Sequence, residues 1–464
     1  MTRARYDVVV LDGRLVGERR VVHGGIAISD GAIVRVLEPG ERPHATRVID
    51  ARGLYVLPGV IDSHVHFRTP GLTHKEDWRH ASRAAVAGGV TTVLDMPNTS
   101  PPLRDPDDVG SKAALVAPDA LVDFGFYLGV APDRVDLLDG ADARRIAAVK
   151  VFMAGHHTAH DVVRDPRDLE RIFAAAARNG LRLAFHAEDQ NVLDAVQRDV
   201  PPPTSVAAYA DAHPRSAALA AVARIVELAR RYGVPCHVLH VSSAQEVDVL
   251  AGAAAEGVPV TFEVTGHHLS LTSDDFERLG TRAHIRPVVR AAADRDRLWD
   301  AVLSGEAASV GSDHAPHSAE EKAAPMPAAP PGMPGVQELL PTVTTGLARV
   351  RPELSLDDRM RVVARVLCAG PARVFGLARK GAIEPGRDAD VVLFDARRKW
   401  TLARDDVHAL CGWSTYEGAE MVGRVETTLR RGEVVYDDGR FAAAGGRWVH
   451  APAHAPERRV ASVA

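Results

Sequence analysis

Short apolar runs at the two ends of the chain have the spacing of β-hairpins. From Tyr6 to about Val56 the runs are YDVVVLDGRLV, GGIAISDGAIVRVL and RVIDARGLYVLPG, with Gly and Asp at turn spacing between them. This pattern is typical of strands joined by tight turns. A similar pattern returns near the C-terminus, in GAIEPGRDADVVLFD and VETTLRRGEVVYDDGRF. We therefore predict that residues 1–57 and 379–447 fold together into one small β-sandwich.

The central segment, residues 58–378, alternates between strands and helices instead. Its eight β-rich runs are VLPGVIDSHVHF, GVTTVLDMPN, LVDFGFYLGV, AAVKVFMAG, LRLAFHAED, PCHVLHVSS, VPVTFEVTGHH and ASVGSDHAPH. Helix-like stretches lie between most of them, such as HKEDWRHASRAAVAGG, DLERIFAAAARNG and SAALAAVARIVELARRYG. This order predicts the α/β class, with a (β/α)8 barrel of TIM type rather than an open sheet. In such barrels the chemistry lies at the C-terminal ends of the strands.

Two stretches have the composition of irregular chain. The segment SAEEKAAPMPAAPPGMPG follows the eighth strand, so it is a candidate lid or rim at the mouth of the barrel. The tail, residues 448–464, is rich in Ala and Pro and is predicted to be disordered. Three histidines in a loop after the fourth strand, His156, His157 and His160, are expected at the surface.

Composition and charge narrow the class of protein. Of the 464 residues, 46% are hydrophobic and 25% charged, which fits a globular protein with a sizeable core. The formal net charge of -5 gives no electrostatic case for binding nucleic acid or an anionic membrane. The three cysteines are far apart and form no C-x-x-C pair, which fits a reducing compartment. The N-terminus enters a strand instead of a signal peptide, and no run reaches the roughly 18 apolar residues of a membrane span. We predict a cytoplasmic protein.

The end of the first barrel strand carries the first candidate metal ligands. Side chains alternate along a strand, so Asp62, His64, His66 and Arg68 share one face of the run DSHVHFR. Two imidazoles at H-x-H spacing lie close enough to bind one metal ion. The alternative is an ordinary polar strand end, but the position at the end of the first strand favours the metal site.

Four later strands end in further candidate ligands. They are Lys150 on the fourth strand, His186 on the fifth, His240 on the sixth and Asp313 on the eighth. Each of these residues alone is more often structural than functional. Their joint placement at one end of a barrel indicates a metal site.

Lys150 needs a separate explanation, because a protonated amine is not a metal ligand. A neutral lysine can add carbon dioxide and become an anionic carbamate. Two cations about 3.5–4 Å apart need a shared anion to offset their repulsion. The alternative, a lysine in a salt bridge at the barrel rim, would be favoured if His186 and His240 were absent. With both present, we predict that Lys150 is carboxylated.

The combined motifs resemble the dihydroorotase branch of the amidohydrolase superfamily. They are PGVIDSHVHFRTPGLTHKED, DMPNTSPP, VKVFMAG, FHAEDQ, HVLHVSS, EVTGHHLSL and GSDHAPHSAEEK. The resemblance runs from about Pro58 to Leu377, and the flanking segments fit the family's β-sandwich. The set is specific for cyclic amidohydrolases and less specific for the ring that is opened.

The resemblance implies a role for each candidate ligand. His64 and His66 would bind one metal ion, His186 and His240 the other, and carboxylated Lys150 would bridge them. Asp313 would bind the first ion and act as base and then acid. The expected ions are two zincs, which bind such mixed nitrogen and oxygen ligands. The implied reaction is the reversible hydrolysis of dihydroorotate to N-carbamoyl-aspartate in pyrimidine biosynthesis, by a metal-bridging hydroxide. The resemblance also implies a homo-oligomer and allows association with a transcarbamoylase.

Four residues are candidate substrate contacts. Arg68 would bind the ring carboxylate, since a guanidinium recognises carboxylate in a charge-assisted and often bidentate way. Asn98 in MPNT and His317 after Asp313 would donate further hydrogen bonds, and Arg286 in HIRPVVR is a weaker candidate. At three positions the chain has a residue other than the one usual in the family's motifs: Thr69, Val288 and Gly266. These departures affect the prediction of the substrate, but not that of the metal site. The neighbours His267 and His268 would point oppositely on a strand, so at most one faces the site, and we expect both to be structural.

Two other functions remain as alternatives. One is a hydantoinase- or allantoinase-like enzyme, whose ring substrate lacks the carboxylate and which, by the resemblance, generally lacks the arginine. The other is a catalytically silent relative that only scaffolds a partner such as a transcarbamoylase. Such a protein is expected to have lost metal ligands, whereas this chain keeps all six.

Overall fold

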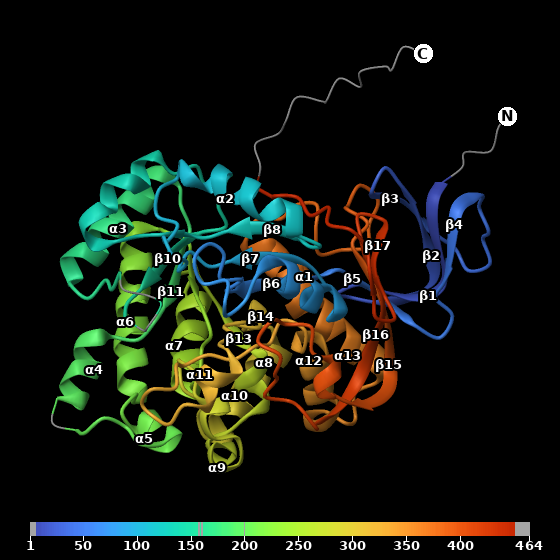
Figure 1. The fold of residues 1–464 in the computed structure, drawn as a ribbon. Helices are drawn as coiled ribbons and strands as arrows, with labels where there is room; N and C mark the ends of the chain where they lie inside the picture. The colour runs from blue at the N-terminus through green and yellow to red at the C-terminus, as the bar shows by residue number, and fades with distance from the viewer. Residues whose placement is uncertain (1–5, 156–157, 159–160, 199, 451–464) are drawn as a thin grey trace.

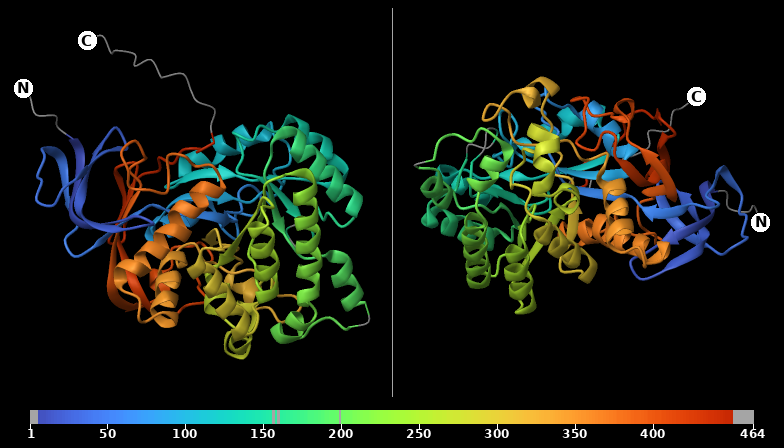
Figure 2. Two further views of the ribbon diagram at one scale, coloured as in Figure 1. Left: turned by 180° about the vertical axis from the view of Figure 1, so that it is seen from behind. Right: turned by 90° about the horizontal axis from the view of Figure 1, so that it is seen from below.

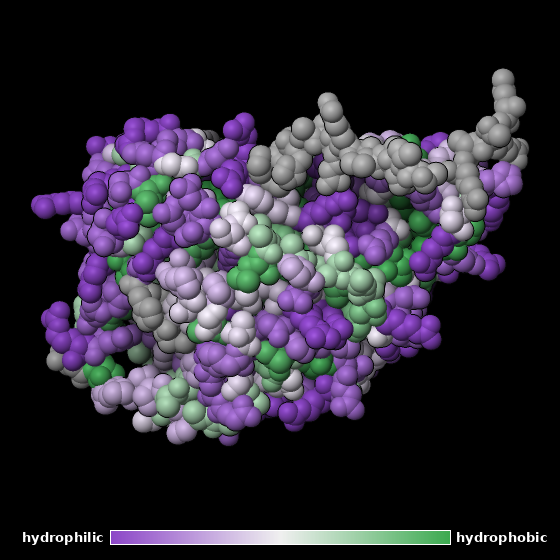
Figure 3. Space-filling model, turned by 45° about the horizontal axis from the view of Figure 1, so that its top comes forward, coloured by the Kyte–Doolittle hydropathy of each residue, from purple (hydrophilic) through white to green (hydrophobic). Residues whose placement is uncertain are grey.

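A barrel and an adjoining sheet make up the computed structural model, which describes residues 6–155, 158, 161–198 and 200–450 (Figure 1). In both views of Figure 2 the blue N-terminal strands and the red C-terminal strands stay together at one side of the barrel. Figure 3 shows a face that is mostly hydrophilic, with hydrophobic patches interspersed. His156, His157, His160 and the tail from residue 451 lie outside the described residues.

Parallel strands form the barrel, as predicted. They are β6 (Val60–Val65), β7 (Val90–Asp95), β8 (Asp123–Phe126), β9 (Leu128–Gly129), β10 (Val149–Phe152), β11 (Leu183–His186), β12 (Cys236–Val238), β13 (Val260–Thr265) and β14 (Ser309–Gly311). The third predicted strand is split in two, since β8 pairs with β7 and β9 pairs with β10. A parallel bridge between Val65 and His314 closes the ring between the first and last strands. The predicted barrel is thus confirmed, and all C-terminal strand ends lie at one mouth.

The helices surround the barrel strands. They are α1 (Trp78–Ala87), α2 (Asp108–Val116), α3 (Pro166–Asn179), α4 (Gln190–Gln197), α5 (Val206–Asp211), α6 (Arg215–Tyr232), α7 (Ala244–Ala255), α8 (Gly266–Ser270), α9 (Phe276–Leu279), α10 (Ala292–Ser304), α11 (Ala319–Ala323), α12 (Leu339–Val350), α13 (Leu356–Ala364) and α14 (Gly370–Val374). The sequence explains where these helices begin and end, as α3 illustrates. In α3 the Asp165 side chain caps the first turn, Pro166 begins the helix, and Gly180 ends it with φ of 62°. Within the described part of the chain, every helix is too short or too polar to cross a bilayer.

One nine-stranded sheet combines both ends of the chain. Its strands are β1 (Tyr6–Val16), β2 (Val21–Ser29), β3 (Ala32–Leu37), β4 (Ala45–Asp50), β5 (Tyr55–Pro58), β15 (Val391–Thr401), β16 (Glu420–Arg430), β17 (Glu433–Asp437) and β18 (Arg440–Phe441). The two ends join at β5, which pairs with β1 on one side and β15 on the other. Val10, Ile26, Val391 and Leu429 belong to one buried cluster, so the two ends share a core. A separate sheet domain built from both termini confirms the predicted fold class.

The sheet passes directly into the barrel. The predicted boundary lies between residues 57 and 58; β5 ends one residue after it, at Pro58, and β6 begins at Val60. Only Gly59 lies between them, and a Cβ there would come within 2.1 Å of the Thr91 side chain. A residue without a side chain is therefore required at this junction.

The predicted tail begins in ordered structure. The backbone of Val449 donates to the Phe124 carbonyl at 2.8 Å, and His450 is buried. Disorder is therefore not seen in residues 448–450, because their backbone pairs with β8. The segment after β14 also packs firmly, since the buried Lys322 donates to the carbonyls of His284 and Pro330.

Candidate active site

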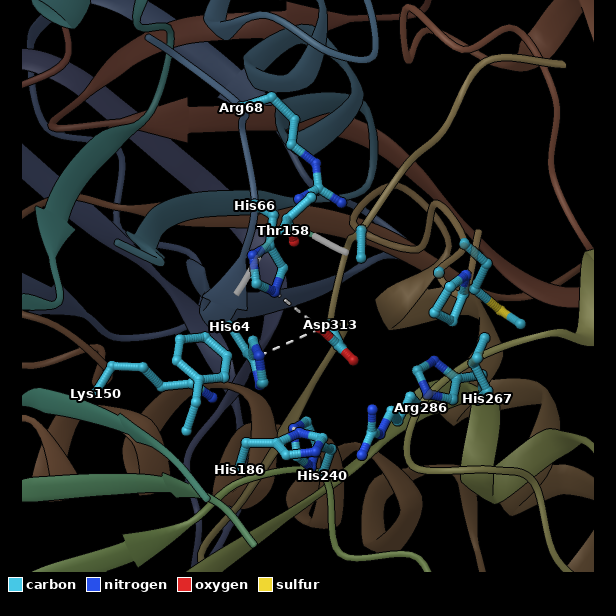
Figure 4. Close-up of a pocket in the computed structure, with 16 residues that line it drawn as sticks. His64, His66, Arg68, Lys150, Thr158, His186, His240, His267, Arg286 and Asp313 are labelled. Carbon is cyan, nitrogen blue, oxygen red and sulfur yellow. Dashed lines mark hydrogen bonds and ion pairs between the residues drawn. The ribbon is translucent and has the colours of Figure 1, made fainter. Parts of the chain in front are cut away.

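The six predicted metal ligands line one small cavity at the C-terminal ends of the barrel strands (Figure 4). They come from β6 and its end (His64, His66), β10 (Lys150), β11 (His186) and the loops after β12 and β14 (His240, Asp313). Five of them are buried, and the side chain of Asp313 is 12% exposed. The parallel barrel thus brings together side chains that are far apart in the sequence.

Three of these side chains converge on one point. His64 Nε2 and His66 Nε2 each lie 3.2 Å from Asp313 Oδ1. The other ring nitrogens donate outward: His64 Nδ1 to Glu263 Oε1 at 2.6 Å, and His66 Nδ1 to Asn98 Oδ1 at 2.7 Å. With the proton on Nδ1, each imidazole would direct the lone pair of Nε2 at a cation bound beside Asp313. Together the three atoms form a group able to hold a metal ion.

A second pair of nitrogens faces the same cavity. His186 Nδ1 lies 3.1 Å from His240 Nε2, and the His64 and His240 rings are 5.2 Å apart between centroids. His186 Nε2 donates to Glu188 Oε2 at 3.1 Å, so the lone pair of Nδ1 is directed at His240. This pair lies beside the first group and could hold a second cation.

Lys150 is buried between these groups. Its Nζ lies 4.6 Å from the centroid of the Phe152 ring, and among the described residues no carboxylate forms a salt bridge with it. Burial lowers the pKa of Lys150 to about 7. A rim salt bridge, the alternative for this lysine, is therefore not seen. A substantial fraction of neutral amine at neutral pH is what carbamate formation needs.

The protonation states in the cavity suit metal binding. Burial lowers the pKa of His66 to about 3 and that of His186 to about 4. Burial alone would raise the pKa of Asp313, but the nearby His64 and His66 rings hold it well below its usual value. Neutral imidazoles and an ionised carboxylate are the forms that bind cations.

Arg68 brings a positive charge to the cavity without an obvious counterion. It is 2% exposed, and its Nη2 makes only a long 3.5 Å contact to the Pro316 carbonyl. Its Nε and Nη1 have no hydrogen-bond partner among the described residues. Burial lowers the pKa of Arg68 to about 10, so the guanidinium still carries its charge at neutral pH. A buried cation with free donors at a cavity wall is a receptor for an anion.

The structure gives the other three predicted substrate contacts protein partners. Asn98 accepts from His66 and donates from Nδ2 to Thr158 Oγ1 at 2.9 Å, so it orients a metal ligand. His317 Nδ1 accepts from Lys75 Nζ at 3.1 Å, and its Nε2 donates to the Pro331 carbonyl at 3.1 Å. Direct substrate contacts by Asn98 and His317 therefore stay predictions.

Arg286 lines the cavity and is tied to a metal ligand. Its Nε lies 2.8 Å from Glu188 Oε2, the same oxygen that accepts from His186, and its Nη1 donates to the Gly155 carbonyl. Arg286 thus fixes the carboxylate that orients His186. Its expected contact with substrate stays a prediction.

Sequence reasoning missed three residues of this site. Glu188 and Glu263 hold the outer nitrogens of His186 and His64. Both lie in motifs already quoted, FHAED and FEVT. The available signal for Glu188 was its position two residues after His186, whereas Glu263 follows no candidate ligand and has no such signal. His267, expected to be structural, lies in the cavity wall. It does not lie on a strand, because β13 ends at Thr265 and the Thr265 side chain caps α8.

The cavity is too small for a ring substrate in this conformation. Its volume is about 30 Å³, room for little more than ions and water. Thr158 and the segment Pro331, Gly332 and Met333 form part of its wall. The loop after β14 is thus at the mouth of the barrel, as expected for a rim or lid.

Comparison with known proteins finds relatives that match nearly the whole chain. Residues 55–435 match the family described as "Amidohydrolase family". A dihydroorotase from Halobacterium salinarum is 38% identical over 436 residues, covering 92% of this chain and 99% of that protein. An allantoinase from Rubrobacter xylanophilus is 35% identical over 465 residues, with 98% and 99% coverage. The solved structure of an L-hydantoinase (dihydropyrimidinase) from Arthrobacter aurescens superposes with a TM-score of 0.89 at 29% identity, covering 95% of this chain and 98% of that one.

Proposed function

The chain belongs to the amidohydrolase family, and from that premise we propose that it is a dihydroorotase. It would hydrolyse the cyclic amide of dihydroorotate to N-carbamoyl-aspartate and catalyse the reverse ring closure. Its relatives include dihydroorotases, allantoinases and hydantoinases, so a hydrolase acting on cyclic amides is supported as a class. The identities of 38% and 35% are too close to choose between the first two. The choice rests on the chemistry of the pocket.

Arg68 is the observation that carries the proposal. Dihydroorotate bears a carboxylate on its ring, whereas the rings of hydantoin and allantoin do not. A buried guanidinium with two free donor atoms matches a carboxylate in charge and in geometry. Without an anion, the buried charge is costly, which argues that the cavity evolved around an anionic ligand.

The residues present fit two divalent cations. His64, His66 and Asp313 would hold one, His186 and His240 the other, and carboxylated Lys150 would lie between them. The four imidazoles that line the cavity and the mixed nitrogen and oxygen donors favour zinc. When bound, such ions activate a water molecule and polarise the amide carbonyl.

The protein's own groups then have separate tasks. Arg68 binds the ring carboxylate and so fixes the orientation of the ring. Asp313 accepts a proton from the attacking water and delivers it to the ring nitrogen when the carbon–nitrogen bond breaks. Glu263, Asn98 and Glu188 keep the imidazoles in place. In the reverse reaction the same groups act in the opposite order.

A panel of ring substrates tests the proposal. Dihydroorotate, dihydrouracil, hydantoin and allantoin would be compared with the purified protein, before and after treatment with a chelator. We expect kcat/KM for dihydroorotate to exceed kcat/KM for each of the other three rings by at least about 100-fold. Only dihydroorotate can form a buried ion pair with Arg68 through a ring carboxylate. Chelation should abolish activity and added zinc should restore it. Faster turnover of allantoin or hydantoin would replace the proposal with that activity. A protein that binds no metal ion and opens no ring would be the silent scaffold.

Lys150 has its own test, the metal content of the Lys150→Met variant. We expect it to bind about one divalent ion or fewer per chain, where the native protein binds two, because the bridging anion is lost. The control is Lys112→Met. Lys112 is also buried, but its Nζ donates to Asp95 Oδ2 at 2.7 Å, and it does not line the cavity. That variant should lower the melting temperature and keep both ions. Crystallographic density beyond Lys150 Nζ in the native protein is the direct check, and a Lys150→Met protein with two ions would contradict the bridge.

Three further predictions belong to this proposal. A cytoplasmic location is predicted from the spacing of the three cysteines, whereas a homo-oligomer and association with a transcarbamoylase rest on the resemblance. Light scattering of the purified protein, alone and mixed with a transcarbamoylase, measures the last two.

A further inference from the structure

His267 occupies a position in the cavity wall that neither the metal ligands nor Arg68 explain. It lies in the first turn of α8, directly after β13, and is 4% exposed. Figure 4 shows its ring turned toward Asp313, on a different side of that residue from Arg68. Its Nε2 is buried and has no hydrogen-bond partner among the described residues. A buried nitrogen left unsatisfied at a cavity wall calls for a ligand.

The adjacent His268 shows that an unsatisfied ring nitrogen is not a general property of histidines in this turn. His268 is buried to the same degree, but its Nδ1 accepts from the Thr265 hydroxyl at 2.7 Å and its Nε2 donates to the Pro287 carbonyl at 3.2 Å. Both of its nitrogens are therefore satisfied, and it does not line the cavity. His268 has a structural role, whereas His267 is open on its Nε2 side.

The surroundings of His267 determine whether its Nε2 atom donates or accepts a hydrogen bond. Burial lowers its pKa to about 4, opposed by the Asp313 carboxylate and by a hydrogen bond to the backbone of Ser312. A backbone carbonyl accepts that hydrogen bond, so the ring proton lies on the nitrogen facing Ser312. Two cations in the cavity would further disfavour an imidazolium. The Nε2 atom facing the cavity is therefore a hydrogen-bond acceptor.

We propose that His267 is a substrate-binding residue whose Nε2 accepts a hydrogen bond from the N–H of the amide that is cleaved. In dihydroorotate this nitrogen lies directly across the ring from the carbon that bears the carboxylate. A ring held by Arg68 at the carboxylate therefore presents its N–H on the opposite side, and His267 lies on a different side of Asp313 from Arg68. The two residues together would fix the ring at both ends of one axis.

The hydrogen bond fits the chemistry of ring opening. Water adds its oxygen to the carbonyl carbon, the carbon–nitrogen bond breaks, and the nitrogen keeps its hydrogen and receives a second one from Asp313. His267 neither gains nor loses a proton in this sequence. It orients the leaving nitrogen, so that the lone pair released by the broken bond faces the proton donor.

This inference rests on the proposed function only in its use of the ring carboxylate. Hydantoin, dihydrouracil and allantoin carry the same N–H at the bond that is cleaved. The role of His267 can therefore be measured on whichever ring the protein opens best. If dihydroorotate is not that ring, the proposed function fails, while the test of His267 proceeds on the preferred substrate.

The test compares a ring with its analogue methylated on that nitrogen, which cannot donate. The variants are His267→Ala, which removes the acceptor, His267→Gln, whose side-chain oxygen can reach a similar position, and His268→Gln as the matched control. Metal content and melting temperature are measured for each. For the native protein we expect kcat/KM to favour the N–H ring over the methylated one by at least about tenfold, the effect of one buried hydrogen bond.

His267→Ala should lose about tenfold in kcat/KM on the N–H ring, mainly through KM, and lose the preference over the methylated ring, with both metal ions retained. His267→Gln should recover part of that preference. His268→Gln should lower the melting temperature and leave the preference unchanged. The inference is overturned if His267→Ala reduces activity on both rings by the same factor, or if His268→Gln removes the preference equally well.

Discussion

Replacing Asp313 with Asn should lower kcat for dihydroorotate hydrolysis by about 1,000- to 10,000-fold, the upper range for loss of a general acid–base group. Asn keeps an oxygen that can face His64 and His66, so metal binding should largely persist. It cannot accept the proton of the attacking water at neutral pH, nor return it to the ring nitrogen. Both directions of the reaction should therefore slow by the same factor. Steady-state rates and metal content on one preparation provide the measurement.

Asp62→Asn is the matched control for this prediction. Asp62 is also buried beside His64, but it accepts hydrogen bonds from the backbone N–H groups of Ser312 at 3.0 Å and His64 at 3.2 Å and from the Ser312 side chain. An Asn oxygen can accept the same bonds, so kcat should fall less than about tenfold. An Asp313→Asn protein that keeps near-normal turnover with both ions bound would remove Asp313 from the chemistry.

The sequence predicts the barrel and its metal ligands because strand periodicity is a local property. Residues two apart on a strand share a face, which is why His64 and His66 both reach Asp313. The order of strands and helices then determines that all C-terminal strand ends meet at one mouth. These inferences need no knowledge of which residues touch across the barrel.

The same rule fails where a strand stops. β6 ends at Val65, and Arg68 has a left-handed φ of 62°, so its place in the cavity does not follow from alternation. β13 ends at Thr265, which caps a helix, so His267 and His268 do not alternate as strand residues would. A Thr before a Gly and a polar pair is a helix-capping signal, and it was the sequence feature that could have shown this turn.

The partners of the substrate contacts could not be predicted from the sequence at all. Lys75 and His317 are 242 positions apart, and Arg286 and Glu188 are 98 apart. Whether a polar side chain is free for substrate depends on such long-range contacts, which residue type and spacing do not reveal. Asn98, His317 and Arg286 are satisfied by the protein, whereas Arg68 and His267 are not. This difference is what directs the two strongest specificity tests to Arg68 and His267.

Replacing Arg68 with Met should lower kcat/KM for dihydroorotate by about 100- to 1,000-fold, as when one partner of a buried charge pair is truncated. Met keeps much of the volume of the arginine stem, so the loss is that of the charge. The effect on dihydrouracil, which has no carboxylate, should be less than about tenfold, because Arg68 makes no charged contact with it. Arg286→Met is the matched control: Arg286 is the other guanidinium at the cavity, but it is bound to Glu188 and through it supports His186. Its loss should reduce activity on both rings alike, and metal content should fall with it. Equal losses on the two rings for Arg68→Met would mean that Arg68 supports the site rather than selecting the substrate, and the choice of dihydroorotate over an uncharged ring would lose its physical basis.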